Sequence, residues 1–404
     1  MTAPVGALAG INVLDISEGV SGPYCAKLLA GLGATVVKVE RPGVGDASRH
    51  YRLAADRLEP IEAHPLFLHL NTGKRSVTVD LDAEGGRGVL HDLVREWADV
   101  VVDSSSLSRA QARGTDWATL SALKPEVILA SLSYFGHTGP YREYAGTELI
   151  ALALGGYLYL TGEPAREPLK PYGYHAEYHA GLHAATGVAA AVVGRYASGL
   201  GDHVDASVVE AATFLASAAP GWAHFYGKDI KRAGNRLANA DPGQGYPSTI
   251  RPCQDGWVHA HNNFRNPDLL AVLMDSERLQ EPDVIAQPAG HADEIDEIMD
   301  RWLATRDRKE IVDLAQEMRL PFTEVFAPAE AQGNEQLIAR EALVELDHPV
   351  AGMLTYVHAP LQFSETPWVA ERAPLLGEHT DAFLQDVLRL EDGRLAEWRQ
   401  KGVI

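Results

Sequence analysis

The first half of this chain alternates short apolar runs with helical patterns, and this alternation constrains the fold more than any other feature. Helical patterns at Gly22–Gly33 and about Ala83–Trp97 lie between runs that are apolar enough to be buried strands. The runs are Ile11–Asp15, Val36–Glu40, Ser76–Asp80, Asp99–Asp103 and Val127–Ser131. Apolar strands spaced by helices predict a parallel sheet covered on both faces, and therefore an α/β fold.

Further along the chain, a change of composition near residue 220 indicates a second, smaller domain. Longer helical patterns precede the change, over about Glu148–Leu160, Glu177–Ala197 and Ala206–Ala218. The segment from Lys228 to Pro247 is rich in Gly, Asn, Asp and Pro, which predicts a loop. A strand pattern and three helical patterns follow, at Trp257–His261, Pro267–Met274, Asp293–Thr305 and Lys309–Met318. The tail is expected to end in a helix near Thr380–Leu390.

Charge and cysteine content narrow the classes of partner. The chain has 404 residues and a formal net charge of −20, which argues against nucleic acid and anionic membranes. An anionic ligand would need a local basic cluster. The two cysteines, Cys25 and Cys253, have no metal-like spacing and fit a reducing cytoplasm. We find neither a signal-peptide pattern nor an apolar run that could span a bilayer, so we expect a cytoplasmic protein.

The stretch from Gly173 to Val193 places one carboxylate, Glu177, at the start of a helix made mostly of Ala, Gly and Val. Such small side chains allow close packing, and we expect this helix to be buried in the core. Unpaired N–H groups and the positive end of the helix dipole favour a carboxylate at this position. Glu177 is therefore either a cap or a reactive group, and the pattern alone leaves both readings open.

The first strand, turn and helix resemble half of a dinucleotide-binding fold, with Glu40 closing the second strand. The turn reads Glu18–Pro23 and lacks the second glycine of G-x-G-x-x-G, so a nicotinamide site is disfavoured. Its backbone could still hold an adenine or a phosphate. Basic residues at the strand ends indicate a binding edge for a phosphate-rich ligand. They are Arg41, Arg49, Lys74 and Arg75.

Two other patterns have competing readings. His175, His179 and His183 are spaced four apart around Glu177, but no clear third ligand accompanies them. We therefore favour packing or hydrogen-bonding histidines and expect no metal. The glycine loop Asp241–Gly245 is usually only a turn. Over a reactive carboxylate, the backbone N–H groups of Gly243 and Gly245 could serve as oxyanion donors.

Together these features resemble the class III CoA-transferases, the family that also contains carnitine CoA-transferase-like, formyl-CoA transferase-like and α-methylacyl-CoA racemase proteins. The resemblance runs over nearly the whole chain and rests on the order and spacing of many short motifs. They are Gly10–Asp15, Gly22–Pro23, Leu32–Pro42, Gly45–Asp46, Arg49, Asn71–Leu81, Ala98–Val102, Gly201–Asp205, Asp255–Trp257, Ala373–His379 and Gly402–Ile404.

The resemblance implies a Rossmann-like large domain over residues 1–220, a small α+β domain over 221–333, and a C-terminal segment, 334–404, that returns to the large domain. It implies subunits that form interlocked rings in a homodimer. The substrates would be an acyl-CoA and a carboxylic acid, with no prosthetic group. The residues expected to bind CoA are Val20, Ser21, Arg41, Lys74, Arg75 and Ser104. Glu177 occupies the place of the family's catalytic aspartate.

Three departures from the family pattern bear on function. Glutamate replaces aspartate at position 177, and Ser104–Ser108 replaces the usual Asn-Phe-Arg-Pro-Gly at CoA contacts. Gly146-Thr147-Glu148 replaces the Gly-His-Asp of the racemases, which removes their histidine base.

We predict an acyl-CoA:carboxylate CoA-transferase that forms an anhydride and then a glutamyl-CoA thioester on Glu177. The alternatives are an acyl-CoA isomerase or racemase that uses Glu177 and Glu148 as bases, and a CoA-binding partner subunit without chemistry. Aromatic residues crowd the expected pocket, which indicates either a bulky acyl group or structural packing. They are Tyr134, Phe135, Tyr141, Tyr157, Tyr172, Tyr174 and Tyr178.

Overall fold

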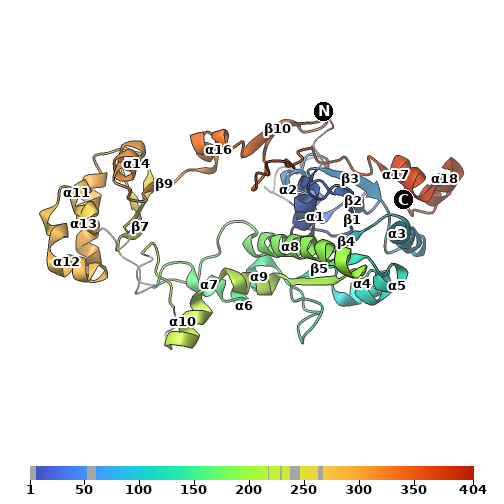
Figure 1. Ribbon diagram of the computed structural model, residues 1–404, viewed down its shortest axis with the longest axis horizontal. Helices are drawn as coiled ribbons and strands as arrows, with labels where there is room; N and C mark the ends of the chain where they lie inside the picture. Colours follow the sequence, from blue (N-terminus) through green and yellow to red (C-terminus); the bar gives the residue numbers. More distant parts are fainter. Residues whose placement is uncertain (1–5, 52–60, 217, 228–229, 237–245, 263–266) are drawn as a thin grey trace. The chain divides into compact units, whose positions relative to one another are not determined.

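The computed structural model describes residues 6–51, 61–216, 218–227, 230–236, 246–262 and 267–404. The chain divides into two compact units (Figure 1). The first comprises Met1–Gly155, Tyr172–Leu215 and Glu335–Ile404, and the second comprises Gly156–Pro171 and Ala216–Asn334. No helix within the described ranges is long and apolar enough to cross a membrane.

The first unit is built on a six-stranded sheet with the order β3-β2-β1-β4-β5-β6, and every strand pair is parallel. The strands are β1 (Asn12–Asp15), β2 (Thr35–Glu40), β3 (Lys74–Thr78), β4 (Val100–Asp103), β5 (Ile128–Ser133) and β6 (His203–Ser207). The register places Val13 of β1 opposite both Val36 and Val100. The strand order reverses between β1 and β4, which makes a topological switch point. The predicted α/β class is confirmed.

All five predicted strands form, whereas β6 was missed. Its sequence, His203–Ser207, is only partly buried because it lies at the edge of the sheet, so it has no continuous apolar run. The helix predicted at Ala206–Ala218 consequently begins only after the strand, as α9 (Val208–Leu215).

Helices cover both faces of the sheet (Figure 1). Alternate side chains of β1 supply two cores, since Val13 packs toward α1 (Ser21–Gly31) and α8 (His175–Ser198), while Leu14 packs on the opposite face. The opposite face is covered by α3 (Glu84–Glu96), α5 (Trp117–Leu123), α17 (Thr380–Leu388) and α18 (Asp392–Gln400). The last two helices come from the end of the chain, so the C-terminal segment completes the first unit.

Helix α8 packs closely against α1 through its small residues, as predicted. A Cβ atom on Gly181 would lie 2.6 Å from the carbonyl oxygen of Ser21, so only glycine fits there. Within one chain, the expectation that α8 is buried holds for only one face of the helix. One face is buried, but Leu182, Val193 and Tyr196 are 46%, 70% and 80% exposed. The helix covers the sheet with one face only. Because the helix is apolar on every face, its sequence did not show which face would be buried.

The remaining elements of the first unit frame its edges. They are the 3₁₀ helix η1 (Ala47–His50), the helices α2 (Pro65–Leu70), α4 (Leu107–Arg113) and α6 (Glu148–Leu154), the short helix α16 (Glu335–Ala339), and the antiparallel hairpin β10 (Leu343–His348) with β11 (Gly352–Val357). The helix predicted over Glu148–Leu160 is two helices, α6 and α7 (Tyr157–Leu160). Gly155 and Gly156, which have low helix propensity, lie at the break.

The second unit contains an antiparallel sheet of β7 (Ser248–Pro252), β8 (Trp257–His261) and β9 (Thr323–Glu324). Its longer helices are α10 (Ala218–Tyr226), α11 (Pro267–Leu273), α13 (Ala292–Leu303) and α14 (Arg308–Glu317). Val258, Met299 and Phe322 are completely buried in its core. The predicted strand and the three predicted helices are therefore present. Strand β7 was not predicted, because it directly follows a segment that has the composition of a loop.

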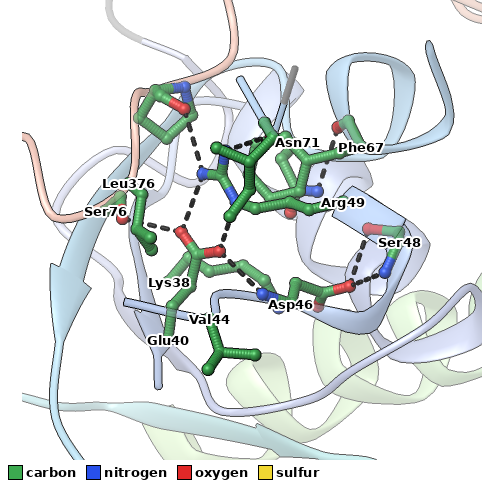
Figure 2. Close-up of polar contacts among 12 residues, drawn as sticks. Lys38, Glu40, Val44, Asp46, Ser48, Arg49, Phe67, Asn71, Ser76 and Leu376 are labelled. Atoms are coloured by element: carbon green, nitrogen blue, oxygen red, sulfur yellow. Dashed lines mark hydrogen bonds and ion pairs between the residues drawn. The ribbon is translucent and has the colours of Figure 1, made fainter. Parts of the chain in front are cut away.

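A buried ion pair between β2 and η1 ties these two elements to three other parts of the first unit (Figure 2). Arg49 Nε lies 2.7 Å from Glu40 Oε2 and Arg49 Nη2 lies 3.0 Å from Glu40 Oε1, with both side chains completely buried. Ser76 of β3 donates to Glu40, and the guanidinium lies 3.4 Å from the centroid of the Phe67 ring. Arg49 Nη2 also donates to the carbonyl oxygen of Pro374.

This arrangement corrects the expectation that Arg49 contributes to a basic binding edge. Its guanidinium binds the carboxylates of Glu40 and Glu62 and two neighbouring carbonyl oxygens. Glu40 is likewise unavailable for the ribose hydroxyl that an acidic residue binds at this position in dinucleotide-binding folds.

Replacing Arg49 by Met should lower the free energy of unfolding by about 3–5 kcal/mol, because it leaves the Glu40 carboxylate buried without its cation. Chemical denaturation followed by circular dichroism measures the loss. Arg394 forms an exposed pair with Glu397 and provides the matched control, where Arg394→Met should change stability by less than about 0.5 kcal/mol. Equal losses in the two variants would contradict the structural role of the buried pair.

Candidate active site

A cavity of about 300 Å³ lies beyond the carboxyl ends of β1, β4 and β5. Open α/β sheets bind ligands at such a switch point, because loops diverge there and leave a crevice. The residues that line it after the three strands include Ile16, Glu18, Gly19 and Ser21 after β1, Ser104, Ser105 and Ser106 after β4, and Tyr134 and Phe135 after β5. Arg109, Arg113, Arg142, Tyr51 and Glu177 also line it.

Glu177 projects into this cavity from the first turn of α8. The residue is 8% exposed, so its carboxylate is largely removed from bulk solvent. The hydroxyl of Tyr134 donates a hydrogen bond of 2.8 Å to Oε1 of Glu177. The carboxylate and a phenol hydroxyl therefore meet at the wall of the cavity.

The cap of α8 comes from a different carboxylate. Glu148 begins α6 and is buried, and its Oε1 and Oε2 accept the backbone N–H groups of Ala176 at 2.9 Å and of Glu177 at 3.1 Å. These donors lie in the first turn, where no intrahelical partner exists. Since Glu148 binds them, the side chain of Glu177 lines the cavity while the helix remains capped.

Two tyrosines on the cavity wall remain protonated near neutral pH. Burial, together with the adjacent charge of Glu177, raises the pKa of Tyr134 well above its usual range. The same two causes raise the pKa of Tyr51 to about 12, and its ring stacks on Tyr174 with 6.3 Å between ring centroids. Both phenols are hydrogen-bond donors at the pH at which an enzyme works.

The opposite part of the cavity is basic. Arg113 binds Asp82 with two hydrogen bonds, of 2.7 and 3.0 Å, and Arg109 and Arg41 approach the same carboxylate at 3.6 and 2.8 Å. Hydrogen bonding from Arg113, followed by the charges of the three guanidinium groups, lowers the pKa of Asp82 to about 2. Three guanidinium groups around one carboxylate leave an excess of positive charge, which suits a multiply charged anion.

Comparison with known proteins identifies the family. Residues 8–380 match the sequence profile of CoA-transferase family III. The chain belongs to this family. It is therefore a CoA-transferase, an enzyme that acts on CoA thioesters, as predicted.

Named relatives and solved structures cover the chain almost completely. It is 31% identical over 425 residues to a formyl-CoA:oxalate CoA-transferase of Rhodopseudomonas palustris, a match that covers 98% of this chain and 97% of that protein. A formyl-CoA:oxalate CoA-transferase of a Bradyrhizobium species is also 31% identical, with the same coverage. The crystal structure of a CaiB/BaiF family protein from Brucella suis superposes with a TM-score of 0.81 at 28% identity and covers 95% of this chain and 100% of that one.

Several of the residues expected to bind CoA line the cavity of this CoA-transferase or lie next to it. Ser21 is the first residue of α1, whose N-terminus has no side-chain cap, and Val20 precedes it as the buried N-cap residue. Ser104 Oγ accepts the backbone N–H of Glu18 at 2.8 Å and so joins the loop after β4 to the turn after β1. Arg41 reaches Asp82 beside the basic wall.

Other expected residues lie elsewhere. Lys74 is buried, and its Nζ donates hydrogen bonds of 2.8 Å to Asp15, to Asn71 and to the carbonyl oxygen of Pro23. Burial in the first place lowers the pKa of Lys74 to about 8. Arg75 is exposed on the edge strand β3. Neither side chain belongs to the cavity wall. Gly243 and Gly245 lie outside the described residues.

Two of the three histidines of α8, His179 and His183, pack against other rings. The rings of His179 and His183 are 6.2 Å apart, and His183 lies 5.5 Å from Phe214. Within the part of the chain that the structure describes, no group of three or more His, Cys, Asp or Glu residues could hold a metal ion.

The sequence did not single out two functional candidates, Arg109 and Arg113. They lie four residues apart on the short helix α4, directly after β4, and share one face. That spacing, read together with the position after a strand, was the available signal. Tyr51 could not have been found in the same way, because only the fold brings it beside Glu177.

Proposed function

We propose that this enzyme transfers CoA from an acyl-CoA to a carboxylic acid, with Glu177 as the nucleophile. The observation that carries the proposal is the placement of a buried glutamate in a cavity at the switch point of the sheet, while another carboxylate caps its helix. A carboxylate that lies in such a cavity can take part in covalent chemistry.

The proposed reaction divides one difficult transfer into easier steps. Attack of Glu177 on the thioester releases CoA thiolate, a good leaving group, and forms a mixed anhydride. CoA then attacks the glutamyl carbonyl carbon and releases the donor acid, which leaves a glutamyl-CoA thioester. The acceptor acid repeats the two steps in reverse order. Formation of an anhydride requires the exclusion of water, which the burial of Glu177 supports.

For binding, we propose that the nucleotide phosphates of CoA lie against Arg109 and Arg113 and near the N-terminus of α1. Guanidinium groups bind phosphate through charge-assisted hydrogen bonds, and an uncapped helix N-terminus favours an anion. Ser104 and Ser21 would contact the same part of the ligand, with Val20 and Arg41 behind them. We retain Gly243 and Gly245 as expected oxyanion donors for the attack on the acyl carbon.

Glu177→Gln should abolish CoA transfer, and Glu177→Asp should lower the rate about a hundredfold, because the shorter side chain withdraws the nucleophile by roughly 1 Å. The assay is a panel of acyl-CoA donors against carboxylic acids. It begins with formyl-CoA and oxalate, the substrates in the names of the two relatives. Mass spectrometry after hydroxylamine treatment should find the modification on Glu177 in the wild-type protein.

The matched control is Glu210→Gln, which removes a carboxylate from the exposed face of α9. It should retain full activity. Undiminished activity in Glu177→Gln, together with an unmodified Glu177 in the wild type, would rule the proposal out.

Arg113→Ala should raise KM for acyl-CoA about 10- to 100-fold with kcat little changed, since a hydrogen bond to a charged group contributes about 1.5–3 kcal/mol. Steady-state kinetics at low and moderate salt measure the effect, which should shrink as salt screens the charges. The control is Arg95→Ala on the exposed part of α3. An unchanged KM in the Arg113 variant would exclude Arg113 from the phosphate site.

We further propose that the enzyme is a homodimer of interlocked subunits, in the cytoplasm. Helices α6, α8 and α9 pack together and expose large apolar side chains, which commonly marks an interface. They are Leu149, Ile150 and Leu154 on α6, Leu182, Val193 and Tyr196 on α8, and Phe214 on α9. Light scattering after gel filtration should give about twice the chain mass of 43.7 kDa, and a single-chain mass would contradict the proposal.

A further inference from the structure

Tyr134 contacts the proposed nucleophile, and the transfer steps described so far give it no role. It is the residue directly after β5, its side chain lines the cavity, and its hydroxyl lies 2.8 Å from Oε1 of Glu177. The hydroxyl thus contacts one oxygen of the reacting carboxylate. Whatever forms on that oxygen during the reaction forms against this donor.

The structure holds Tyr134 in place from two sides. Its carbonyl oxygen accepts the backbone N–H of Val209 at 3.0 Å and the hydroxyl of Ser207 at 3.2 Å, which fixes the backbone between β5 and α9. Its ring lies directly against Gly146, where an added Cβ atom would be 2.2 Å from Cγ of the tyrosine. A donor held this firmly needs little reorganisation during the reaction.

We propose that Tyr134 is a catalytic residue that stabilises the oxyanion formed on Oε1 when the Cδ carbon of Glu177 is attacked. This inference rests on the proposed function of Glu177. It gives the enzyme a separate oxyanion donor for the glutamyl carbon, distinct from donors that serve the acyl carbon of the substrate.

The atoms and electrons balance as follows. Oε2 of Glu177 attacks the acyl carbon, the carbon–sulfur bond breaks, and CoA leaves as thiolate, so that Oε1 becomes the carbonyl oxygen of the glutamyl half of the anhydride. The thiolate then attacks Cδ, and the carbonyl π electrons move onto Oε1. The carbonyl forms again as the Cδ–Oε2 bond breaks, and the donor acid leaves as a carboxylate that carries Oε2. No proton is gained or lost by the enzyme.

The hydrogen bond from Tyr134 strengthens during this step, which is the condition for it to accelerate the reaction. In the anhydride Oε1 is a neutral carbonyl oxygen, and in the tetrahedral intermediate it carries a whole negative charge. In the resting carboxylate the charge is shared between two oxygens. Burial and the nearby charge of Glu177 raise the pKa of Tyr134, so its hydroxyl keeps its proton and remains a donor.

The test separates the two chemical steps in Tyr134→Phe, which keeps the ring and removes only the hydroxyl. The probe is formyl-CoA, followed by the other donors of the panel, mixed with enzyme in the absence of acceptor acid. A thiol reagent measures CoA release, and intact-protein mass spectrometry after rapid quenching measures the glutamyl-CoA adduct. We expect the variant to release CoA rapidly but to form the adduct about 10²–10³-fold more slowly, with a matching loss in kcat.

Two further variants distinguish chemistry from packing. Gly146→Ala retains the phenol but displaces its ring, and should slow adduct formation in the same way. Tyr356→Phe removes another buried hydroxyl from β11, one with no hydrogen-bond partner within the described residues, and should leave both steps unchanged. Thermal melting of each variant checks folding, because a merely structural role would lower stability without separating CoA release from adduct formation.

The outcomes are distinct. If the wild type forms the adduct and Tyr134→Phe forms it at the same rate, Tyr134 is not the oxyanion donor and the function of Glu177 stands. If the wild type forms no adduct with any donor, the proposed function fails, and the role of Tyr134 fails with it.

Discussion

Two hydrogen bonds from the backbone of α8 to Glu148 determine what the rest of the site can do. A helix N-terminus attracts the nearest carboxylate, and in α8 the nearest one in sequence is Glu177 itself. A carboxylate that satisfies backbone N–H groups is stabilised as an anion and is a weaker nucleophile. Because Glu148 comes from another helix to bind these donors, the cavity receives a glutamate that is held by a tyrosine instead.

The basic residues show a similar division. Some form ion pairs inside the fold, and others lie beside the cavity. The chain has a large negative net charge, yet it buries Lys38, Arg49 and Lys74. Each is bound to carboxylates that end β1 and β2 or follow them. Beside the cavity, Arg109 and Arg113 of the short helix α4 share Asp82 with Arg41, which follows β2. An anion can therefore bind to these arginines, and no buried carboxylate loses its cation as a result.

The sequence was sufficient for the parts of the fold that depend on local pattern. Strands β1, β2, β4 and β5 each contain consecutive buried apolar residues, and the small residues of α8 predict its close contact with α1, which Gly181 makes. The hydrophobic pattern of the sequence did not predict the burial of elements that are only partly buried. Strand β6 lies at an edge and does not show the apolar signal, and α8 is apolar on a face that the first unit does not cover.

The sequence predicted the central residue of the site, Glu177, but predicted the residues around it less completely. Glu177 could be singled out because it is the one carboxylate in an apolar helix. Its two readings could not be separated, because the deciding residue, Glu148, is 29 positions away in the chain. The sequence likewise did not show which carboxylate pairs with each basic residue, so the contact between Lys74 and Asp15 became visible only in the fold.

The return of the chain's end to the sheet has a consequence for how the protein is made. One face of the sheet is covered by side chains of α17 and α18 and by Val403 and Ile404, the last two residues. On the ribosome, the first five strands emerge long before these residues exist, and the whole second unit is synthesised in between. Part of that apolar face stays uncovered until residues 380–404 have been synthesised, which makes it the surface where a chaperone would act and where chains lacking these residues would aggregate.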